Sequence, residues 1–189
     1  MSTETRLITA EEFDQMHFDV PVELVRGEIV YPYGEDGMTR PDLVHGAICG
    51  NIYHSLRVWA RSNDYGFVVT NDSGFRTEQD PDSIRGADVA FFPMDRLPNG
   101  KLPRRTRDIV PQLCVEVLSP SNTASEINRK RQEYLGCGVE EVWIVDPDMR
   151  SVEVFRRDAA PKSYEETETL TSSALVEFAA PVEDFFEGV

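Results

Sequence analysis

Two acidic residues stand inside apolar segments that have the composition of buried strands. Asp88 lies in GADVAFF and Glu116 lies in QLCVEVL, and an unpaired charge in such surroundings is energetically costly. If the two strands are neighbours in a sheet, about 4.8 Å apart, the carboxylates converge and a divalent cation relieves their repulsion. The pair therefore predicts a site for Mg2+, with Mn2+ as the other candidate, where the ion activates water and offsets charge on a phosphodiester.

Each of these residues also has an ordinary structural explanation. Either acid, taken alone, could pair with an arginine or lie on a solvated face of a sheet. Lys130 follows in NRKRQEY, and its ammonium group could orient attacking water or stabilise the pentacoordinate phosphorus. Because Arg129 and Arg131 flank it, an exposed basic helix face is the simpler interpretation from the residues alone.

Two further residues are candidate accessory groups. Glu23 would stand near the acids only if its segment packs against the helix that begins near Pro41. His45 lies near the start of that helix, one position beyond its apolar stripe, where an imidazole could reach a cleft; a lone histidine is more often structural. The sequence lacks a Gly-rich phosphate loop, an HExxH pair, a GxSxG elbow and a spaced Cys/His zinc set.

The elements that must position these groups follow from the apolar pattern. Residues 42–63 repeat apolar side chains at helical spacing, so we expect the longest helix there. Strands are expected at FVVTN, SGFRTE, ADVAFFP, QLCVEVLSP and EEVWIVD, with Asn71-Asp72 separating the first two and Gly66 suited to stopping the helix. Alternation in the fourth strand places Glu116 on the face opposite Val115 and Val117.

The connections between these segments predict a mixed sheet. Ser121 or Asn122 can cap a helix that runs to about Leu135, which is long enough for a parallel crossover between two strands. The Pro147-Asp148 turn calls instead for an antiparallel hairpin. The expected fold class is therefore α/β (α+β), a mixed central sheet flanked by helices.

The two ends of the chain add smaller elements. Thr9 and Glu12 match a capping box, which predicts a short helix with Phe13 and Met16 turned toward the core. Arg26-Gly27 fits a tight hairpin. The segments 167–171 and 174–179 are expected to be further edge strands, followed by a short terminal segment.

Length and composition limit the classes of protein. The chain has 189 residues and 40% hydrophobic content, so we expect a single domain over residues 1–189. The cysteines Cys49, Cys114 and Cys137 are odd in number and far apart, which is typical of reduced residues in a cytoplasmic protein. No apolar run approaches the roughly 20 residues that span a bilayer, so we expect no membrane partner.

The charge distribution bears on nucleic-acid binding in two opposite ways. A net charge of -15 argues against strong nonspecific attraction to nucleic acid, which depends on clustered Lys and Arg. Basic residues are nevertheless concentrated in one stretch, at Arg96, Lys101, Arg104, Arg105 and Arg107. That stretch is either a nucleic-acid-binding surface or a solvated, charge-rich loop.

The chain resembles the Uma2 family of restriction-endonuclease-like proteins. The resemblance rests on ELVRGEIV, the helix with His45 and Asn51, GADVAFF, VEVLSPS, and K-x-x-x-Y with GVEEVWIVDP, in this order along most of the chain. It implies a PD-(D/E)XK nuclease fold in which Asp88 and Glu116 bind Mg2+ and Glu23 is the additional helical or N-terminal acid. Two positions depart from the superfamily signature. Leu118 stands where a lysine is usual, which implies that Lys130 substitutes for it, and Ala87 stands where the motif has proline.

Three functions are therefore open from the sequence. The leading hypothesis is a Mg2+-dependent endonuclease that hydrolyses phosphodiester bonds in DNA, with Asp88, Glu116, Lys130 and Glu23 as catalytic residues. The alternative is a noncatalytic nuclease-like module that binds nucleic acid or protein, since fold does not secure function. The third is a self-associating structural protein, which an exposed sheet edge would permit. We expect a homodimer. Because symmetric pairing also suits double-strand cleavage, dimerisation alone would not distinguish a structural protein from a nuclease.

Overall fold

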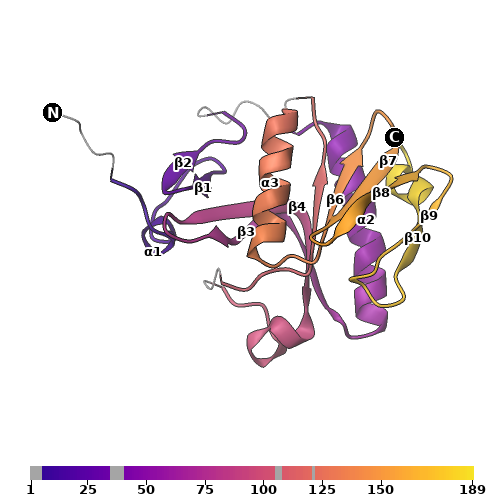
Figure 1. Cartoon of the computed structure of the whole chain (residues 1–189), viewed down its shortest axis with the longest axis horizontal. Coiled ribbons are helices and arrows are strands. Elements are labelled where there is room, and N and C mark those ends of the chain that lie inside the picture. The colour runs from indigo at the N-terminus through magenta and orange to yellow at the C-terminus, as the bar shows by residue number, and fades with distance from the viewer. Residues whose placement is uncertain (1–5, 35–40, 105–107, 121) are drawn as a thin grey trace.

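The computed structural model describes residues 6–34, 41–104, 108–120 and 122–189. Within these residues, a mixed sheet of eight strands forms the centre of the protein, in the order β2-β1-β4-β5-β6-β7-β8 with β3 paired to β4 (Figure 1). The strands are β1 Glu23–Val25, β2 Glu28–Val30, β3 Gly66–Glu78, β4 Ser83–Pro93, β5 Leu113–Val117, β6 Glu141–Asp146, β7 Ser151–Arg156 and β8 Ala159–Glu165. The predicted fold class, a mixed sheet flanked by helices, is confirmed.

Two long helices cover opposite faces of this sheet. Helix α2 (Leu43–Ser62) packs on one face through Ile48, Ile52 and Leu56, which are fully buried. Helix α3 (Ala124–Cys137) packs on the other face through Tyr134, which belongs to a separate core cluster. The helix predicted over residues 42–63 is confirmed, and Asp42 and Asn63 are its two caps.

The strand directions also agree with the connections. Strands β5 and β6 are parallel, with α3 as the crossover, and β6 and β7 are antiparallel. On β5, Val115 and Val117 point into the core beneath α2, and Cys114 belongs to the core beneath α3. The alternation of side chains along a strand therefore turns Glu116 toward α3, on the face opposite the two valines, and this opposite face was predicted.

The segments FVVTN and SGFRTE are one strand, β3, and not two. Its pairing with β4 shifts register between Thr70 and Ser73, so Asn71 and Asp72 form a bulge. Both adopt positive φ, 62° and 48°, which Asn and Asp tolerate better than other residues. The two residues that suggested a turn are thus absorbed into a bulge beside the continuous strand β4. Gly66 does not stop α2 but begins β3.

The N-terminal elements match the prediction in part. Helix α1 (Ala10–Phe13) has the Thr9–Glu12 capping box, and Phe13 is buried. Met16 lies beyond this single turn and is exposed, so its predicted core position is wrong. The hairpin at Arg26-Gly27 is confirmed, with positive φ at both residues as a type I′ turn requires.

The start of α3 differs by one or two residues from the expectation. Thr123 is the N-cap, and it forms a capping box with Glu126. Asn122 lies outside the helix, where its side-chain oxygen accepts a hydrogen bond from the backbone N–H of Ser119. Ser121 lies outside the described residues. Thr123 is the better cap because it has Glu126 three positions later, the spacing that satisfies two backbone donors at once.

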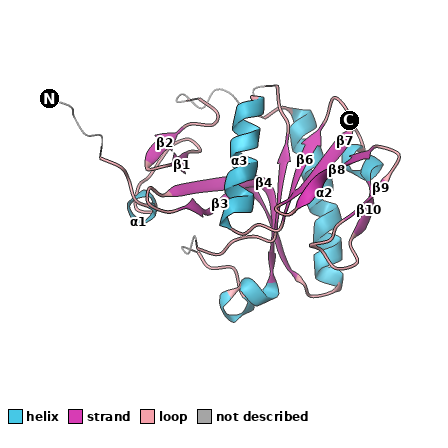
Figure 2. Ribbon diagram, viewed as in Figure 1, coloured by secondary structure: helices cyan, strands magenta, loops and turns pink. Residues whose placement is uncertain are grey.

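The C-terminal segments do not extend the central sheet. Strands β9 (Thr169–Thr171) and β10 (Ala179–Pro181) pair with each other in a separate two-stranded sheet, at the opposite end of the molecule from the β1–β2 hairpin (Figure 2). The final 3-10 turn η3 (Val182–Phe186) buries Phe185 and Phe186 in the core beneath α2. The edge strand in this region is β8, which the sequence pattern did not predict. Among the described helices, none has the length and apolar character needed to cross a membrane.

Candidate active site

The two predicted acids meet on neighbouring antiparallel strands. Val89 pairs with Val115 and Ala90 with Cys114, so the same register, one step further, sets Asp88 opposite Glu116. The ladder is interrupted there because the Asp88 carboxylate accepts the backbone N–H of Val117 at 2.7 Å. The strands thus bring the two carboxylates together at the point where their pairing ends.

Both acids line a cleft of about 260 Å3. Its wall includes the N-terminal ends of both long helices, since Asp42 and Asn122 line it together with Ser119. The full lining is Pro32, Tyr33, Pro41, Asp42, His45, Asp72, Asp88, Glu116, Val117, Ser119, Pro120, Asn122 and Lys130. Four of the five predicted chemical groups, Asp88, Glu116, Lys130 and His45, therefore share one cleft.

Glu116 is the most deeply buried acid of this cleft. Its Oε1 accepts the hydroxyl of Tyr134 at 2.7 Å, and its Oε2 accepts the ammonium group of Lys130 at 3.1 Å. Burial and the nearby charge of Asp88 raise the pKa of Glu116 to about 7, against the opposing effect of Lys130. The carboxylate is therefore only partly compensated by the protein's own groups.

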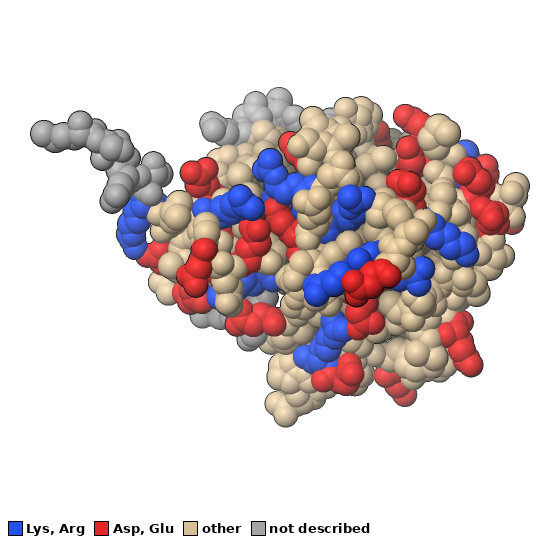
Figure 3. Space-filling view, viewed as in Figure 1, with Lys and Arg blue, Asp and Glu red and all other residues tan. Residues whose placement is uncertain are grey.

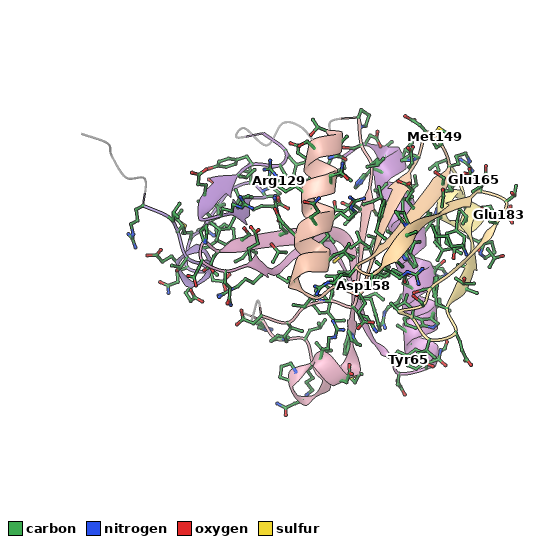
Figure 4. The ribbon with its side chains drawn as sticks, viewed as in Figure 1. Tyr65, Arg129, Met149, Asp158, Glu165 and Glu183 are labelled. Carbon is green, nitrogen blue, oxygen red and sulfur yellow. The ribbon has the colours of Figure 1, made fainter. Side chains whose placement is uncertain are left out.

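Lys130 is not the exposed lysine that its sequence neighbours suggest. Its Nζ lies 3.1 Å from Glu116 and 3.6 Å from Glu23, and only 19% of its side chain is exposed. Burial disfavours the charged amine, but Glu116 and Glu23 outweigh it and raise the pKa of Lys130. Arg129, in contrast, is exposed on α3 (Figure 4).

Glu23 enters the site from strand β1, in the N-terminal part of the chain, and not from a helix. Its Oε2 accepts the Arg85 guanidinium at 2.6 Å, and Lys130 contacts its other oxygen. Arg85 also binds Glu133 of α3 through two hydrogen bonds, of 2.7 and 2.9 Å. A buried guanidinium thus ties β4 to both β1 and α3, and it fixes the carboxylate that faces Lys130.

His45 reaches the cleft from the first turn of α2. Asp42 caps the helix by accepting the backbone N–H of His45 at 2.8 Å, and the ring Nε2 lies 3.3 Å from the Asp88 carboxylate. Burial disfavours the charged imidazole, but the hydrogen bond and charge of Asp88 outweigh it and raise the pKa of His45. The ring therefore favours one position of the Asp88 carboxylate.

Two groups in the cleft were missed by the sequence analysis. Asp72, on the β3 bulge, lines the cleft and accepts the hydroxyl of Tyr33 at 3.1 Å. Burial and the charge of Asp88 raise the pKa of Asp72. The bulge fits only because Gly86 faces it, since a Cβ there would lie 2.1 Å from the Asp72 carbonyl oxygen. In the sequence, Asn71-Asp72 has the composition of a turn between two strands, so no sequence signal placed Asp72 near Asp88.

The described residues of the basic stretch do not line this cleft. Arg96 binds the carbonyls of Val110 and Pro111 at 3.3 and 3.1 Å, and it also contacts Glu140. Its 3-10 turns, η1 (Met94–Arg96) and η2 (Pro98–Gly100), lie at the far end of α3 from the helix N-terminus (Figure 1). Lys101 and Arg104 are exposed. Arg105 and Arg107 lie outside the described residues.

The raised pKa of Glu116 predicts a pH-dependent stability in metal-free buffer. The ordinary value is near 4.5 and the folded value about 7, so between them the folded chain binds more protons than the unfolded chain. The free energy of unfolding should then fall as pH rises through this interval. In Glu116→Gln this contribution is absent, so raising the pH should lower the free energy of unfolding of the wild type more than that of the variant. Urea unfolding of both proteins in EDTA, at about pH 5 and about pH 8, measures it; parallel changes would contradict it.

Comparison with known proteins places the chain in a family. The family model Uma2, described as "Putative restriction endonuclease", matches residues 10–183. The chain belongs to the Uma2 family. No curated protein matches. A solved structure, described as a "putative nuclease belonging to DUF820" from Anabaena variabilis, is 21% identical over 95% of this chain and 97% of that chain, with a TM-score of 0.78.

These findings confirm the resemblance and the fold. The match to Uma2 spans Glu23 and all the residues that line the cleft, from Pro32 to Lys130. The structural likeness shows that this chain shares the fold of the Anabaena protein across nearly its whole length. The family match indicates a nuclease-like protein, and the roles of the individual cleft residues must be argued from their chemistry.

Proposed function

We propose that the protein is a divalent-metal-dependent endonuclease that hydrolyses phosphodiester bonds in DNA. One observation carries the proposal: Asp88, Glu116 and Lys130, from two strands and a helix, line the same cleft. Two acids and a lysine are the groups that metal-assisted phosphodiester hydrolysis uses. The description of the Uma2 family and that of the Anabaena protein, a "putative nuclease", support the same reaction class.

The donor set of the cleft fits Mg2+ or Mn2+. Asp88 and Glu116 offer carboxylate oxygens, which these ions prefer, and their mutual repulsion contributes to the raised pKa of Glu116. We propose that these two residues hold the ion. When bound, it supplies positive charge to the phosphodiester and lowers the pKa of a coordinated water.

Lys130 supplies charge in this proposal and does not act as a base. Because Glu116 and Glu23 raise its pKa, the amine is protonated at neutral pH. It can donate hydrogen bonds to a water or to a phosphate oxygen, but it cannot accept a proton. Glu23 is a positioning residue, since its carboxylate lies 3.6 Å from the ammonium group that also contacts Glu116.

His45 has the role of orienting Asp88. Its Nε2 contacts the same carboxylate oxygen that accepts the N–H of Val117. Asp88 Oδ2 is therefore held from both the β5 backbone and α2, and Oδ1 is engaged by neither of these two groups. Preorganisation of this kind matters because a ligand that needs no reordering costs less on binding.

Binding of DNA must overcome the charge of the protein. The face seen in Figure 3 carries Lys and Arg interspersed with Asp and Glu, so it is no uniformly basic surface. The N-terminal ends of α2 and α3 border the cleft, and these ends favour a phosphate. We propose that the substrate approaches along them, that Lys101, Arg104, Arg105 and Arg107 add backbone contacts, and that affinity is low and dependent on salt.

The net charge of -15 favours one alternative. A noncatalytic module with the same fold would bind nucleic acid or protein and would need no metal. Calorimetric titration with Mg2+ and Mn2+ discriminates the two, because the nuclease requires binding that depends on Asp88 and Glu116. We further propose that residues 1–189 act as one domain and that two copies pair as a homodimer. Light scattering tests the pairing, because it measures the mass of the particle in solution.

Replacing Lys130 by methionine tests the proposal directly. Loss of the ammonium group should lower the cleavage rate at saturating DNA on the order of a hundredfold, with a smaller change in KM, because the charge acts on the reacting phosphate. The assay incubates supercoiled, linear and single-stranded DNA with Mg2+ or Mn2+. Arg129→Met is the matched control, since it removes an exposed cation from the adjacent position of α3. Equal cleavage rates for Lys130→Met and Arg129→Met, or no cleavage by the wild type, would refute the proposed nuclease function.

A further inference from the structure

Three potential metal ligands of different chemistry converge beside the carboxylate pair. His45 and Cys49 lie one turn apart on α2, and Asp88 faces them from β4. One ligand atom from each residue can be chosen so that all three lie within 4.8 Å of one another. The Cys49 sulfur is 3.6 Å from the His45 Nδ1, and the Asp88 Oδ2 is 3.3 Å from the Nε2.

Each of these two separations, which run to different nitrogens of the His45 ring, is close to the distance between two ligand atoms in a tetrahedral metal site. Bonds of about 2.0 to 2.3 Å to N, O and S place the ligand atoms about 3.3 to 3.6 Å apart around Zn2+. A single ring nitrogen binds the ion, so a rotation of the imidazole and a small approach of the side chains complete the set. The spacing of four residues between His45 and Cys49 makes this possible, because it puts both on one helix face.

The donor chemistry selects a different ion from the one proposed for Asp88 and Glu116. A thiolate and an imidazole are poor ligands for Mg2+, but they are typical ligands of Zn2+ and of Co2+. Asp88 adds one oxygen, which gives an N, S, O set. Three protein ligands and an open fourth position are the pattern of zinc sites that bind water or an exogenous ligand.

Open space lies against these ligands. All three line a hollow of about 350 Å3, together with Gly46 and Gly50 of the same helix. A Cβ at either glycine would meet nothing within 4 Å, so this face of α2 is uncovered where the ligands project. Each glycine costs a helix roughly 0.5 to 1 kcal/mol relative to alanine, and both line the hollow into which the ligands project.

We propose that His45, Cys49 and Asp88 form a second metal site, selective for Zn2+ over Mg2+, with water as the fourth ligand. On binding, the Cys49 thiol releases its proton to solvent and the thiolate bonds to the ion. Because Asp88 also belongs to the carboxylate pair, occupancy of the second site withdraws it from Mg2+. Zn2+ should therefore inhibit cleavage. The inhibition rests on the proposed nuclease function, but the binding does not.

Co2+ is the probe, because it replaces Zn2+ and its absorption reports a bound thiolate. Titrating the metal-free protein with Co2+ should produce a near-ultraviolet sulfur-to-cobalt band that excess Mg2+ does not remove and that Zn2+ does. Cys49→Ser should lack the band, and Cys137→Ser, at a half-buried cysteine of α3, should keep it. Circular dichroism establishes that each variant is folded. A wild-type spectrum without the band, or a band that survives in folded Cys49→Ser, would overturn the site.

Cleavage assays then test the inhibition separately. If the wild type cleaves DNA with Mg2+, low Zn2+ should stop it, and Cys49→Ser should need at least roughly tenfold more Zn2+, since even groups that only orient ligands are worth that factor. Equal Zn2+ sensitivity of the two proteins would overturn the shared use of Asp88. A cobalt band without any cleavage would support the second site and contradict the nuclease.

Discussion

Replacing Asp88 by asparagine should lower metal-dependent cleavage by about a thousandfold. The carboxylate contributes one of the two negative charges that we propose hold the ion, and asparagine keeps the shape of the side chain but not the charge. Electrostatic groups at the reacting centre are commonly worth two to three orders of magnitude in rate. The measurement is the rate of plasmid cleavage in Mg2+ at saturating DNA, with calorimetry of Mg2+ binding on the same samples.

The asparagine variant also separates chemistry from folding. Its side-chain oxygen can still accept the N–H of Val117, the hydrogen bond that Asp88 makes at 2.7 Å. The strand junction should therefore survive, and thermal unfolding should confirm it. Asp95→Asn is the matched control, because Asp95 is exposed on η1 and lines neither of the hollows next to Asp88. A folded Asp88→Asn protein that binds and cleaves like the wild type would refute the assignment of the metal to Asp88.

Replacing Arg85 by methionine should produce the largest loss of stability. Arg85 is buried between Glu23 and Glu133, with side-chain exposures of 7%, 8% and 4%. Removing the guanidinium leaves two buried carboxylates without their partner, which costs about 3 to 5 kcal/mol. Urea unfolding near neutral pH measures the change as a lower midpoint, with Arg129→Met as the exposed control.

A compensating variant identifies the cause of that loss. Adding Glu23→Gln and Glu133→Gln to Arg85→Met removes the uncompensated charges, so part of the stability should return. If the triple variant is no more stable than Arg85→Met, the loss comes from packing and not from charge. Arg85→Met alone should also reduce cleavage, because Glu23 is then free to pull Lys130 away from Glu116.

The local pattern of the sequence already contained much of the fold. The spacing of apolar residues over 42–63 predicted α2 to its caps, because helical periodicity is a property of neighbouring residues. Alternation around Glu116 gave its face correctly for the same reason. The length of the segment after Glu116 was enough to predict the parallel crossover, since a short turn cannot join parallel strands.

Irregular backbone was less accessible from the sequence. Asn71-Asp72 carries the same residue types as a turn, and only the continuous partner strand β4 turns it into a bulge. Segment 167–171 contains β9, but segment 174–179 is a loop that reaches strand β10 only at Ala179, and β9 and β10 pair with each other and not with the central sheet. Both cases depend on which strand is available as a pairing partner, and local composition does not determine that partner.

The residues of the cleft divide in the same way. The sequence alone determined that Asp88 and Glu116 are acids in buried strands, and therefore that each needs a partner. Only the tertiary structure decided which partners they have: Lys130 and Tyr134 for Glu116, and His45 for Asp88. Charge and burial are local properties, whereas a contact between residues far apart in the chain depends on strand register and on the helix that packs above it.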